Sequence, residues 1–288
     1  MKKILISLAG GSIPGGLFAA GAVEELAKEF VVKKASGASS GAINGAALMS
    51  GHGNELGDLW LDALNDLHGL VTLNPIKVVK NNSFFLIQEF AYNFFETMVR
   101  KNYLNDCHDL LIAYTKLSQR FFPSEKITIA DRLLFPWLIL PAVRKKIGMT
   151  TETVDIEKIS KDRRLSVLKA SCCLPFFHGL PVKIDKHICF DGQLNQDLGG
   201  APELLRFYNP GDYVALIFRY EVGNPKNLSR TQQFYSLCQS YSIPRKNIMI
   251  IAPNEKLPIS GHYDIDRDNY KICVEMGRRM ARYNIAKY

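Results

Sequence analysis

The order of patterns in the first fifty residues constrains the fold most. Ile4–Ala9 is a short apolar run that ends at two glycines, as is typical of a buried strand. Gly16–Phe30 has apolar residues at helical spacing, and acidic residues lie on the opposite face. A second apolar run, Val31–Ala35, precedes a helix of small and apolar residues, Ser40–Ser50. This alternation predicts an α/β fold whose parallel strands are covered by helices.

The rest of the chain fits one α/β domain. Residues 55–148 show no clear strand signal, so we expect them to be mostly helical, as a lid or insertion. No repeat, low-complexity stretch or linker divides the chain. Later segments also have patterns typical of secondary structure. Val182–Phe190 predicts a hairpin with its turn at Asp185-Lys186. We also expect two strands, Tyr213–Tyr220 and Asn247–Ala252, and a basic closing helix, Asp266–Lys287.

Composition excludes several classes of protein. Of the 288 residues, 47% are hydrophobic and 22% charged, which is unlike disordered, collagenous, coiled-coil or polytopic membrane proteins. The net charge of +8 suits nucleic acid, anionic lipid or an acidic protein. Because the basic residues are dispersed and no nucleic-acid module is present, we expect no nucleic-acid partner. The six cysteines form no CxxC or zinc-like spacing, so we expect neither a disulfide framework nor a metal, and no cofactor.

The N-terminus superficially resembles a signal peptide, because Lys2 and Lys3 precede an apolar run. That run is short, and glycines follow where a signal peptide would continue, so a first strand is the better interpretation. We therefore expect a cytoplasmic protein that can contact an anionic membrane peripherally. Export without a signal peptide and the oligomeric state stay open.

A GxSxG pattern, Gly37-Ala38-Ser39-Ser40-Gly41, lies between a predicted strand and a predicted helix. A serine on such a turn has a strained backbone that exposes its hydroxyl, and flanking glycines prevent collisions with the adjoining elements. The N-terminus of the following helix favours negative charge at the serine. Ser39 is therefore a candidate nucleophile. The alternative is a Gly/Ser-rich helix cap.

A second glycine-rich segment, residues 10–16, lies between the first predicted strand and helix. Its backbone N–H groups could bind an anion. The spacing does not fit a dinucleotide-binding GxGxxG, and no lysine is present for a phosphate-binding loop. Because the first two strands should be neighbours, we expect this loop to form an oxyanion hole over Ser39. A plain tight turn is the alternative.

A serine nucleophile needs a base. His178, His187 and His262 are each isolated in the sequence. Asp191 differs, because a strand-like stretch delivers it directly onto Gly192, where its carboxylate can approach a loop. A Ser39–Asp191 pair and a triad with His262 both stay open on this ground.

Four motifs together resemble patatin-like acyl hydrolases. Gly10-Gly11, the GxSxG of residues 37–41, the stretch Ala170–Pro175 and Asp191-Gly192 occur in that family's order and at about its spacing. The resemblance spans nearly the whole chain and is weakest between residues 55 and 150. It implies a three-layer α/β sandwich with a mainly parallel central sheet, as one domain over residues 1–288.

The resemblance also implies roles for particular residues. Ser39 would be the nucleophile and Asp191 the base of a Ser–Asp dyad without histidine. The oxyanion hole would be formed by the backbone N–H groups of Gly10, Gly11 and Ser12. The glycines that support the motifs would be Gly15, Gly37, Gly41 and Gly192.

Three positions depart from the family pattern. Ser12 replaces the third loop glycine, and Pro14 occupies a position where the family has lysine or arginine. Gln193 follows Asp191-Gly192, where the family prefers glycine or alanine. The missing cation weakens an electrostatic contribution and Gln193 can crowd the dyad, so a slow enzyme or a pseudoenzyme stays open.

The resemblance implies hydrolysis of fatty-acyl esters of phospholipids, lysophospholipids or acylglycerols through an acyl-enzyme. The alternatives are an acyltransferase and a non-catalytic protein that binds lipid or a partner. Ala38 stands where carrier-protein acyltransferases commonly have histidine. A phenylalanine-rich stretch, residues 84–122, is either an acyl groove or helical core.

Overall fold

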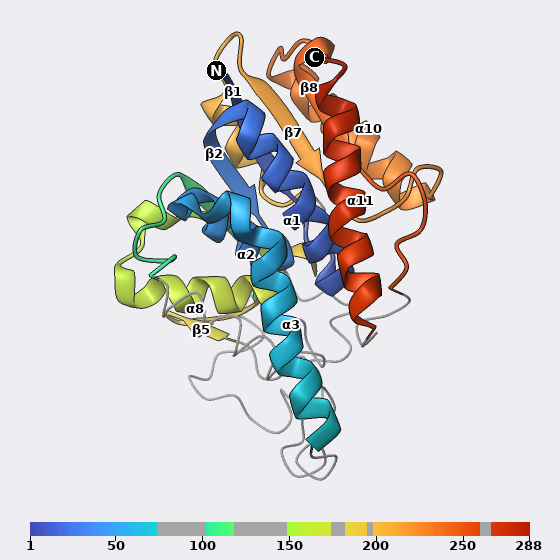
Figure 1. Ribbon diagram of the computed structural model, residues 1–288. Coiled ribbons are helices and arrows are strands. Elements are labelled where there is room, and N and C mark those ends of the chain that lie inside the picture. The colour runs from blue at the N-terminus through green and yellow to red at the C-terminus, as the bar shows by residue number, and fades with distance from the viewer. Residues whose placement is uncertain (74–101, 118–148, 174–181, 195–197, 260–265) are drawn as a thin grey trace.

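The protein forms a mixed, mostly parallel sheet covered by helices on both faces. This computed structural model describes residues 1–73, 102–117, 149–173, 182–194, 198–259 and 266–288 (Figure 1). The described strands are β1 (Lys2–Leu8), β2 (Phe30–Gly37), β3 (Leu110–Lys116), β4 (Thr150–Asp155), β5 (Val182–Ile184), β6 (His187–Asp191), β7 (Tyr213–Ile217) and β8 (Ile248–Ile251). Their order is β5-β6-β3-β2-β1-β7-β8, and β4 also pairs with β3.

The central strands of the sheet are apolar because helices cover them on both faces. β3, β2, β1, β7 and β8 run parallel, whereas β4, β5 and β6 pair antiparallel. Ile4, Ile6 and Leu8 point into one core, and Leu5 between them points into another. Because both faces are covered, β1 carries apolar side chains on both of its faces rather than on one. The prediction of a covered parallel sheet is confirmed.

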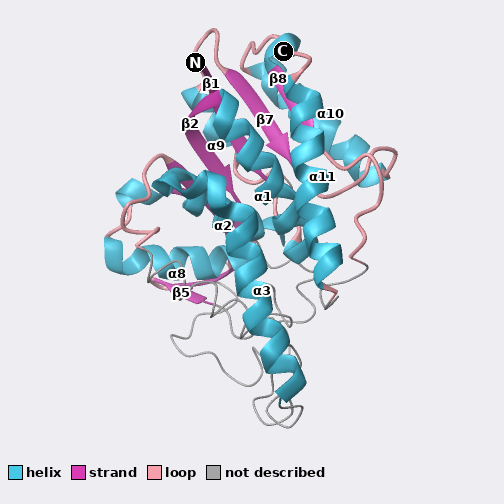
Figure 2. Cartoon of the chain, in the orientation of Figure 1, coloured by secondary structure: helices cyan, strands magenta, loops and turns pink. Residues whose placement is uncertain are grey.

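The helices form the two outer layers of a three-layer sandwich. Those described are α1 (Ser12–Glu29), α2 (Ser40–Ala47), α3 (Leu56–Leu73), α8 (Lys161–Cys172), α9 (Ala201–Leu204), α10 (Pro225–Ser240) and α11 (Arg267–Ile285). Figure 2 shows α1 and α11 side by side in front of the sheet. Residues of α1, α2, α3, α8 and α11 share one core, and residues of α9 and α10 share the other.

The predicted helical character of residues 55–148 is correct for α3 and wrong for residues 110–116. Those residues form β3, which is buried along almost its whole length at the centre of the sheet. A short apolar run such as this one cannot be assigned to strand or helix by periodicity, which is why the prediction failed. Residues 74–101 and 118–148, with the phenylalanine-rich stretch, lie outside the described residues.

β3 is also where β2 and β6 meet. β2 pairs with residues 110–112 of β3, and β6 pairs with residues 114–116. β4 pairs with residues 111–116 and therefore occupies the other edge of β3. β2 runs parallel to β3 and β6 antiparallel to it, so their C-terminal ends approach one another beside Ala113.

The basic side chains of α11 are relevant to the predicted contact with an anionic membrane. Arg278, Arg279 and Arg282 are in ion pairs with Glu24, Glu255 and Glu275, so acidic neighbours offset these cations. Among the described helices, none has the length and apolarity needed to cross a bilayer. Peripheral contact with an anionic membrane stays a prediction.

Candidate active site

Ser39 lies on a strained turn between β2 and α2. Its φ is 55° and its ψ is −132°, a combination that is costly for any residue with a side chain. β2 ends at Gly37 and α2 begins at Ser40, so Ser39 is the N-cap of the helix. A serine held in this way at a strand-to-helix turn has the geometry of a nucleophile elbow.

Close contacts with backbone atoms require glycine at both glycine positions of the GxSxG motif. A Cβ atom at Gly41 would lie 2.1 Å from the carbonyl oxygen of Leu8, at the end of β1. A Cβ atom at Gly37 would lie 2.4 Å from the carbonyl oxygen of Gly41. Any side chain at either position would therefore push the elbow away from the sheet.

Asp191 is the last residue of β6 and is completely buried. Its Oδ1 accepts a hydrogen bond of 2.8 Å from the backbone N–H of Gln193. Its Oδ2 is buried and has no partner at normal hydrogen-bond distance within the described part of the chain. A buried carboxylate oxygen without a partner is costly, and such groups concentrate at functional sites.

Burial raises the pKa of Asp191 from 3.8 to about 7, because desolvation disfavours the carboxylate. The Ser39 hydroxyl and the Gln193 N–H oppose this rise by favouring the charged form. The hydroxyl thus lies beside the carboxyl, although they share no hydrogen bond of normal length. A carboxyl with a pKa near neutrality is suited to act as a general base.

The C-terminal end of α8 links the nucleophile to the base. The backbone N–H of Ser39 donates to the carbonyl oxygen and to the hydroxyl of Ser171, at 3.1 and 3.0 Å. The Ser171 hydroxyl in turn donates to the carbonyl oxygen of Ala113 in β3, at 2.7 Å. The backbone N–H of Asp191 donates to the carbonyl oxygen of Cys173, at 2.9 Å. The segment 171–173 therefore sets the separation of Ser39 and Asp191.

The glycine loop is shorter than predicted. α1 begins at Ser12 rather than near Gly16, because the N–H of Gly15 already donates to the carbonyl oxygen of Gly11, at 3.0 Å. Pro14 is tolerated there, since the first turn of a helix does not need its N–H. The loop itself is Ala9-Gly10-Gly11.

The loop lies directly against the candidate nucleophile. A Cβ atom at Gly10 would lie 2.6 Å from the Cβ atom of Ser39. The N–H of Gly11 donates to the hydroxyl of Ser40, at 3.1 Å, so this donor already has a partner. Ser12 has a φ of 59°, a left-handed conformation that suits the glycine expected at this position. The sequence-predicted loop and elbow are thus brought together.

Two side chains that the sequence did not assign hold this loop. The Gln193 side chain donates from Nε2 to the carbonyl oxygen of Gly10, at 2.7 Å. The Arg219 side chain donates from Nη1 to the carbonyl oxygen of Gly11, at 3.2 Å. A Cβ atom at Gly15 would lie 3.2 Å from the Cβ atom of Arg219, so the Arg219 side chain packs against the first turn of α1. Gln193 was noted only as a departure, and no sequence signal connected Arg219 to the loop.

Gly192 closes the turn after Asp191. A Cβ atom there would lie 2.1 Å from the carbonyl oxygen of Ala113. The turn therefore requires glycine, because its backbone lies directly against β3.

Of the three histidines considered as bases, the structure describes His187. His187 begins β6, and Asp191 ends it four residues later. That distance is about 13 Å along an extended strand, so His187 lies away from the site. His178 and His262 lie outside the described residues, so a role for His262 stays open.

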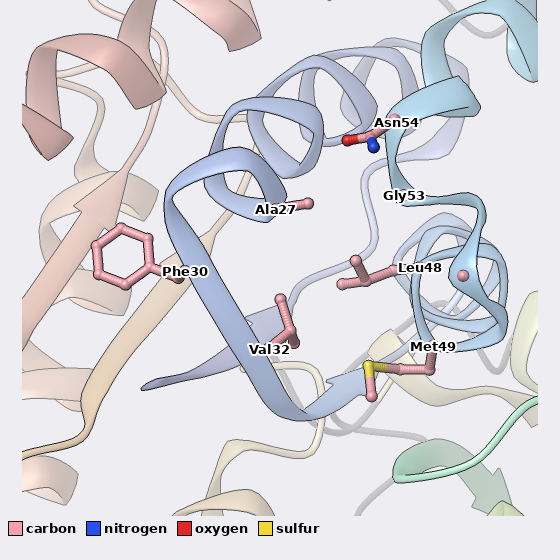
Figure 3. A pocket seen from close by; sticks show the side chains of 8 residues that line it. Ala27, Phe30, Val32, Leu48, Met49, Gly53 and Asn54 are labelled. Carbon is pink, nitrogen blue, oxygen red and sulfur yellow. The ribbon is translucent and has the colours of Figure 1, made fainter. Parts of the chain in front are cut away.

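A cavity of about 370 Å³ lies at the opposite end of β2 from Ser39 (Figure 3). It contains none of the predicted site residues; its lining is Ala27, Phe30, Val32, Leu48, Met49, Gly51, Gly53 and Asn54. Within the described ranges, no three acidic, histidine or cysteine side chains gather as a metal site would need.

Comparison with known proteins identifies a family. A family model described as patatin-like phospholipase matches residues 6–198, more than half of the chain. The matched region includes the glycine loop, the elbow and Asp191. A search of curated proteins finds no match.

Proposed function

The chain belongs to the patatin-like phospholipase family, whose members are generally lipid acyl hydrolases, and from this premise we propose a Ser–Asp dyad mechanism. The substrates are fatty-acyl esters of phospholipids, lysophospholipids or acylglycerols. Ser39 is the nucleophile and Asp191 the general base.

One observation carries the proposal. A serine in a strained elbow lies beside a buried carboxyl whose pKa is about 7 and whose Oδ2 has no partner among the described residues. A structural carboxylate would be fully hydrogen-bonded or solvated, and a structural serine would not need a costly backbone.

The first half-reaction forms an acyl-enzyme. Ser39 Oγ attacks the ester carbonyl carbon while the Asp191 carboxylate accepts the hydroxyl proton. Backbone N–H groups of the glycine loop stabilise the oxyanion that develops. The tetrahedral intermediate then releases the alcohol, which takes the proton from Asp191, and the acyl group stays on Ser39.

The second half-reaction regenerates the enzyme. Asp191 accepts a proton from water as the water oxygen attacks the acyl carbonyl carbon. The second tetrahedral intermediate expels Ser39 Oγ, which recovers the proton, and the fatty acid is released.

The oxyanion donors are the N–H groups of Gly10, Gly11 and Ser12. Gly10 lies against Ser39, which supports this placement. The Gly11 N–H donates to Ser40 Oγ, so it serves the oxyanion only by sharing or leaving that bond. One well-placed donor is worth about 3–4 kcal/mol in acyl transfer.

Phospholipid digestion with product analysis by mass spectrometry tests the proposal. The wild-type protein should release fatty acid, whereas purified Ser39→Ala and Asp191→Asn variants should release less than about one thousandth as much. Ser240→Ala and Asp106→Asn, both at exposed positions, are the matched controls and should keep full activity.

Three outcomes would count against the proposal. Retained turnover in folded Asp191→Asn protein would refute the dyad. Loss of turnover in His262→Ala equal to that in Ser39→Ala would favour the triad. Transfer of the acyl group to an acceptor other than water, without free fatty acid, would favour an acyltransferase.

A further inference from the structure

We propose that Gln193 and Arg219 are positioning residues that clamp the glycine loop above Ser39. The inference rests on the proposed function, since the loop matters only if an oxyanion forms there. The two side chains come from distant parts of the chain and hold two consecutive carbonyl groups of the loop.

Gln193 connects the base to the loop. Its backbone N–H donates to Asp191 Oδ1 at 2.8 Å, and its side-chain Nε2 donates to the Gly10 carbonyl oxygen at 2.7 Å. A Cβ atom placed at Gly10 would lie 2.8 Å from Gln193 Cδ, so the side chain packs directly on the loop. A single residue therefore touches the carboxyl that accepts the proton and the loop beside the nucleophile.

Arg219 reaches the loop from the neighbouring strand. It follows the C-terminal end of β7, which pairs in parallel with β1, and the glycine loop follows the C-terminal end of β1. Its Nη1 donates to the Gly11 carbonyl oxygen, and its guanidinium lies 5.2 Å from the ring centre of Tyr220. The guanidinium thus interacts with both the aromatic ring and the loop.

The clamp acts through the planar peptide bond. In a trans peptide the C=O and the following N–H point in opposite directions, so fixing one fixes the other. Gln193 fixes the peptide between Gly10 and Gly11, whose N–H donates to Ser40 Oγ on the opposite side and in this position serves the oxyanion by sharing that bond. Arg219 is a second donor to the Gly11 carbonyl oxygen, which also accepts from the Gly15 N–H, and the two bonds together set the direction of the Ser12 N–H.

The loop needs this support because its residues restrict it little. Gly10 and Gly11 lack side chains that would restrict rotation. Oxyanion donors work only when they already point at the developing charge, and misplacement by about 1 Å costs about 100-fold in rate. The positive charge of Arg219 also favours negative charge nearby.

The opposite interpretation is that Gln193 obstructs the dyad. The two interpretations predict opposite signs for the same substitution. If Gln193 obstructs, Gln193→Ala should raise kcat, because it removes bulk beside Ser39. If Gln193 clamps, Gln193→Ala should lower kcat about 10- to 100-fold.

The experiment measures kcat and KM of the full chain with a water-soluble fatty-acyl ester. We expect Gln193→Ala and Arg219→Met to lower kcat about 10- to 100-fold with little change in KM, because the loop acts mainly in the transition state. Arg219→Lys should recover part of the loss, since it can still donate to Gly11. Exposed Gln233→Ala and Arg206→Met are the matched controls and should match the wild type.

A pH profile separates positioning from general damage. Gln193→Ala should keep the wild-type acid limb, because the backbone N–H on Asp191 remains. Gln193→Glu should move that limb to higher pH, since a second negative charge beside Asp191 raises the pKa of its carboxyl.

The outcomes separate the inference from the proposed function. If the wild-type protein neither hydrolyses the ester nor reacts with a fluorophosphonate, the proposed function fails and takes the inference with it. If the wild type is active and Gln193→Ala is equally fast or faster, only the inference fails. A rise in KM with unchanged kcat in both variants would also overturn it.

Discussion

Asp191 combines two properties that rarely occur in one residue, complete burial and an oxygen without a partner among the described residues. Burial alone raises its pKa, and the Ser39 hydroxyl and Gln193 N–H limit the rise. The result is a base that changes charge near neutral pH. In this account, the position of Asp191 thus supplies the basicity that histidine provides in other serine hydrolases.

The pH dependence of hydrolysis follows from this pKa. Because the base must be ionised, kcat/KM should fall about tenfold for each pH unit below about 7 and level off above about pH 8. The measurement is kcat/KM for a neutral soluble ester between pH 5 and 9, with circular dichroism at each pH to confirm folding. An acid limb near pH 4 would contradict the assignment of Asp191 as the base.

Among individual residues, the sequence pointed to the proposed nucleophile and base but not to the residues that hold them in place. Ser39 and Asp191 lie in short motifs whose glycines are required by close contacts, so local pattern carries the information. The roles of Ser171, Gln193 and Arg219 depend on contacts between residues that are far apart in the sequence. No local spacing reveals such contacts.

At the element scale, the site depends on β3. β2 and β6 approach end to end along one edge of this strand, which places the elbow after Gly37 beside Asp191. The sequence predicted both β2 and β6 but not β3, since an apolar run as short as residues 110–114 is ambiguous between strand and helix. The order of motifs along the chain was therefore predictable, and the way in which their elements meet was not.

The Ser171 hydroxyl tests this arrangement, because it bonds both the Ser39 backbone and β3. Ser171→Ala should lower the free energy of unfolding by about 1–3 kcal/mol, since it leaves the buried carbonyl group of Ala113 without this bond. It should also lower kcat about tenfold, because the turn that carries Ser39 would be held less rigidly.

Chemical denaturation and kcat check this prediction, and Ser240→Ala is the control. Ser240 also donates to a backbone carbonyl, but at an exposed position. A Ser171→Ala protein with wild-type stability and kcat would show that the Ser171 hydroxyl does not position the nucleophile.

At the scale of the whole molecule, stability and activity oppose one another at Asp191. The carboxyl has a pKa of about 7 in the folded protein and an ordinary value of 3.8. The folded state therefore binds this proton more tightly than the unfolded chain. Its contribution to stability is fully present below about pH 4 and is lost as the pH rises through 7.

Asp191→Asn should consequently stabilise the protein while abolishing turnover. The amide carries no buried charge, so the free energy of unfolding should rise by about 2–4 kcal/mol at pH 8 and by less than about 1 kcal/mol at pH 4. Thermal denaturation at both pH values measures the difference, with Asp106→Asn as the exposed control. If Asp191→Asn is no more stable than the wild type at pH 8, the buried carboxylate does not destabilise the folded protein.

Covalent labelling with a fluorophosphonate tests the central claim most directly, since it asks whether Ser39 is a nucleophile activated by Asp191. Attack by Ser39 Oγ on phosphorus releases fluoride and leaves a stable adduct that peptide mass spectrometry locates. We expect one adduct, on Ser39, absent from Ser39→Ala and formed at least about 100-fold more slowly in Asp191→Asn. An unmodified Ser39, or equal labelling of the Asp191→Asn variant, would contradict it.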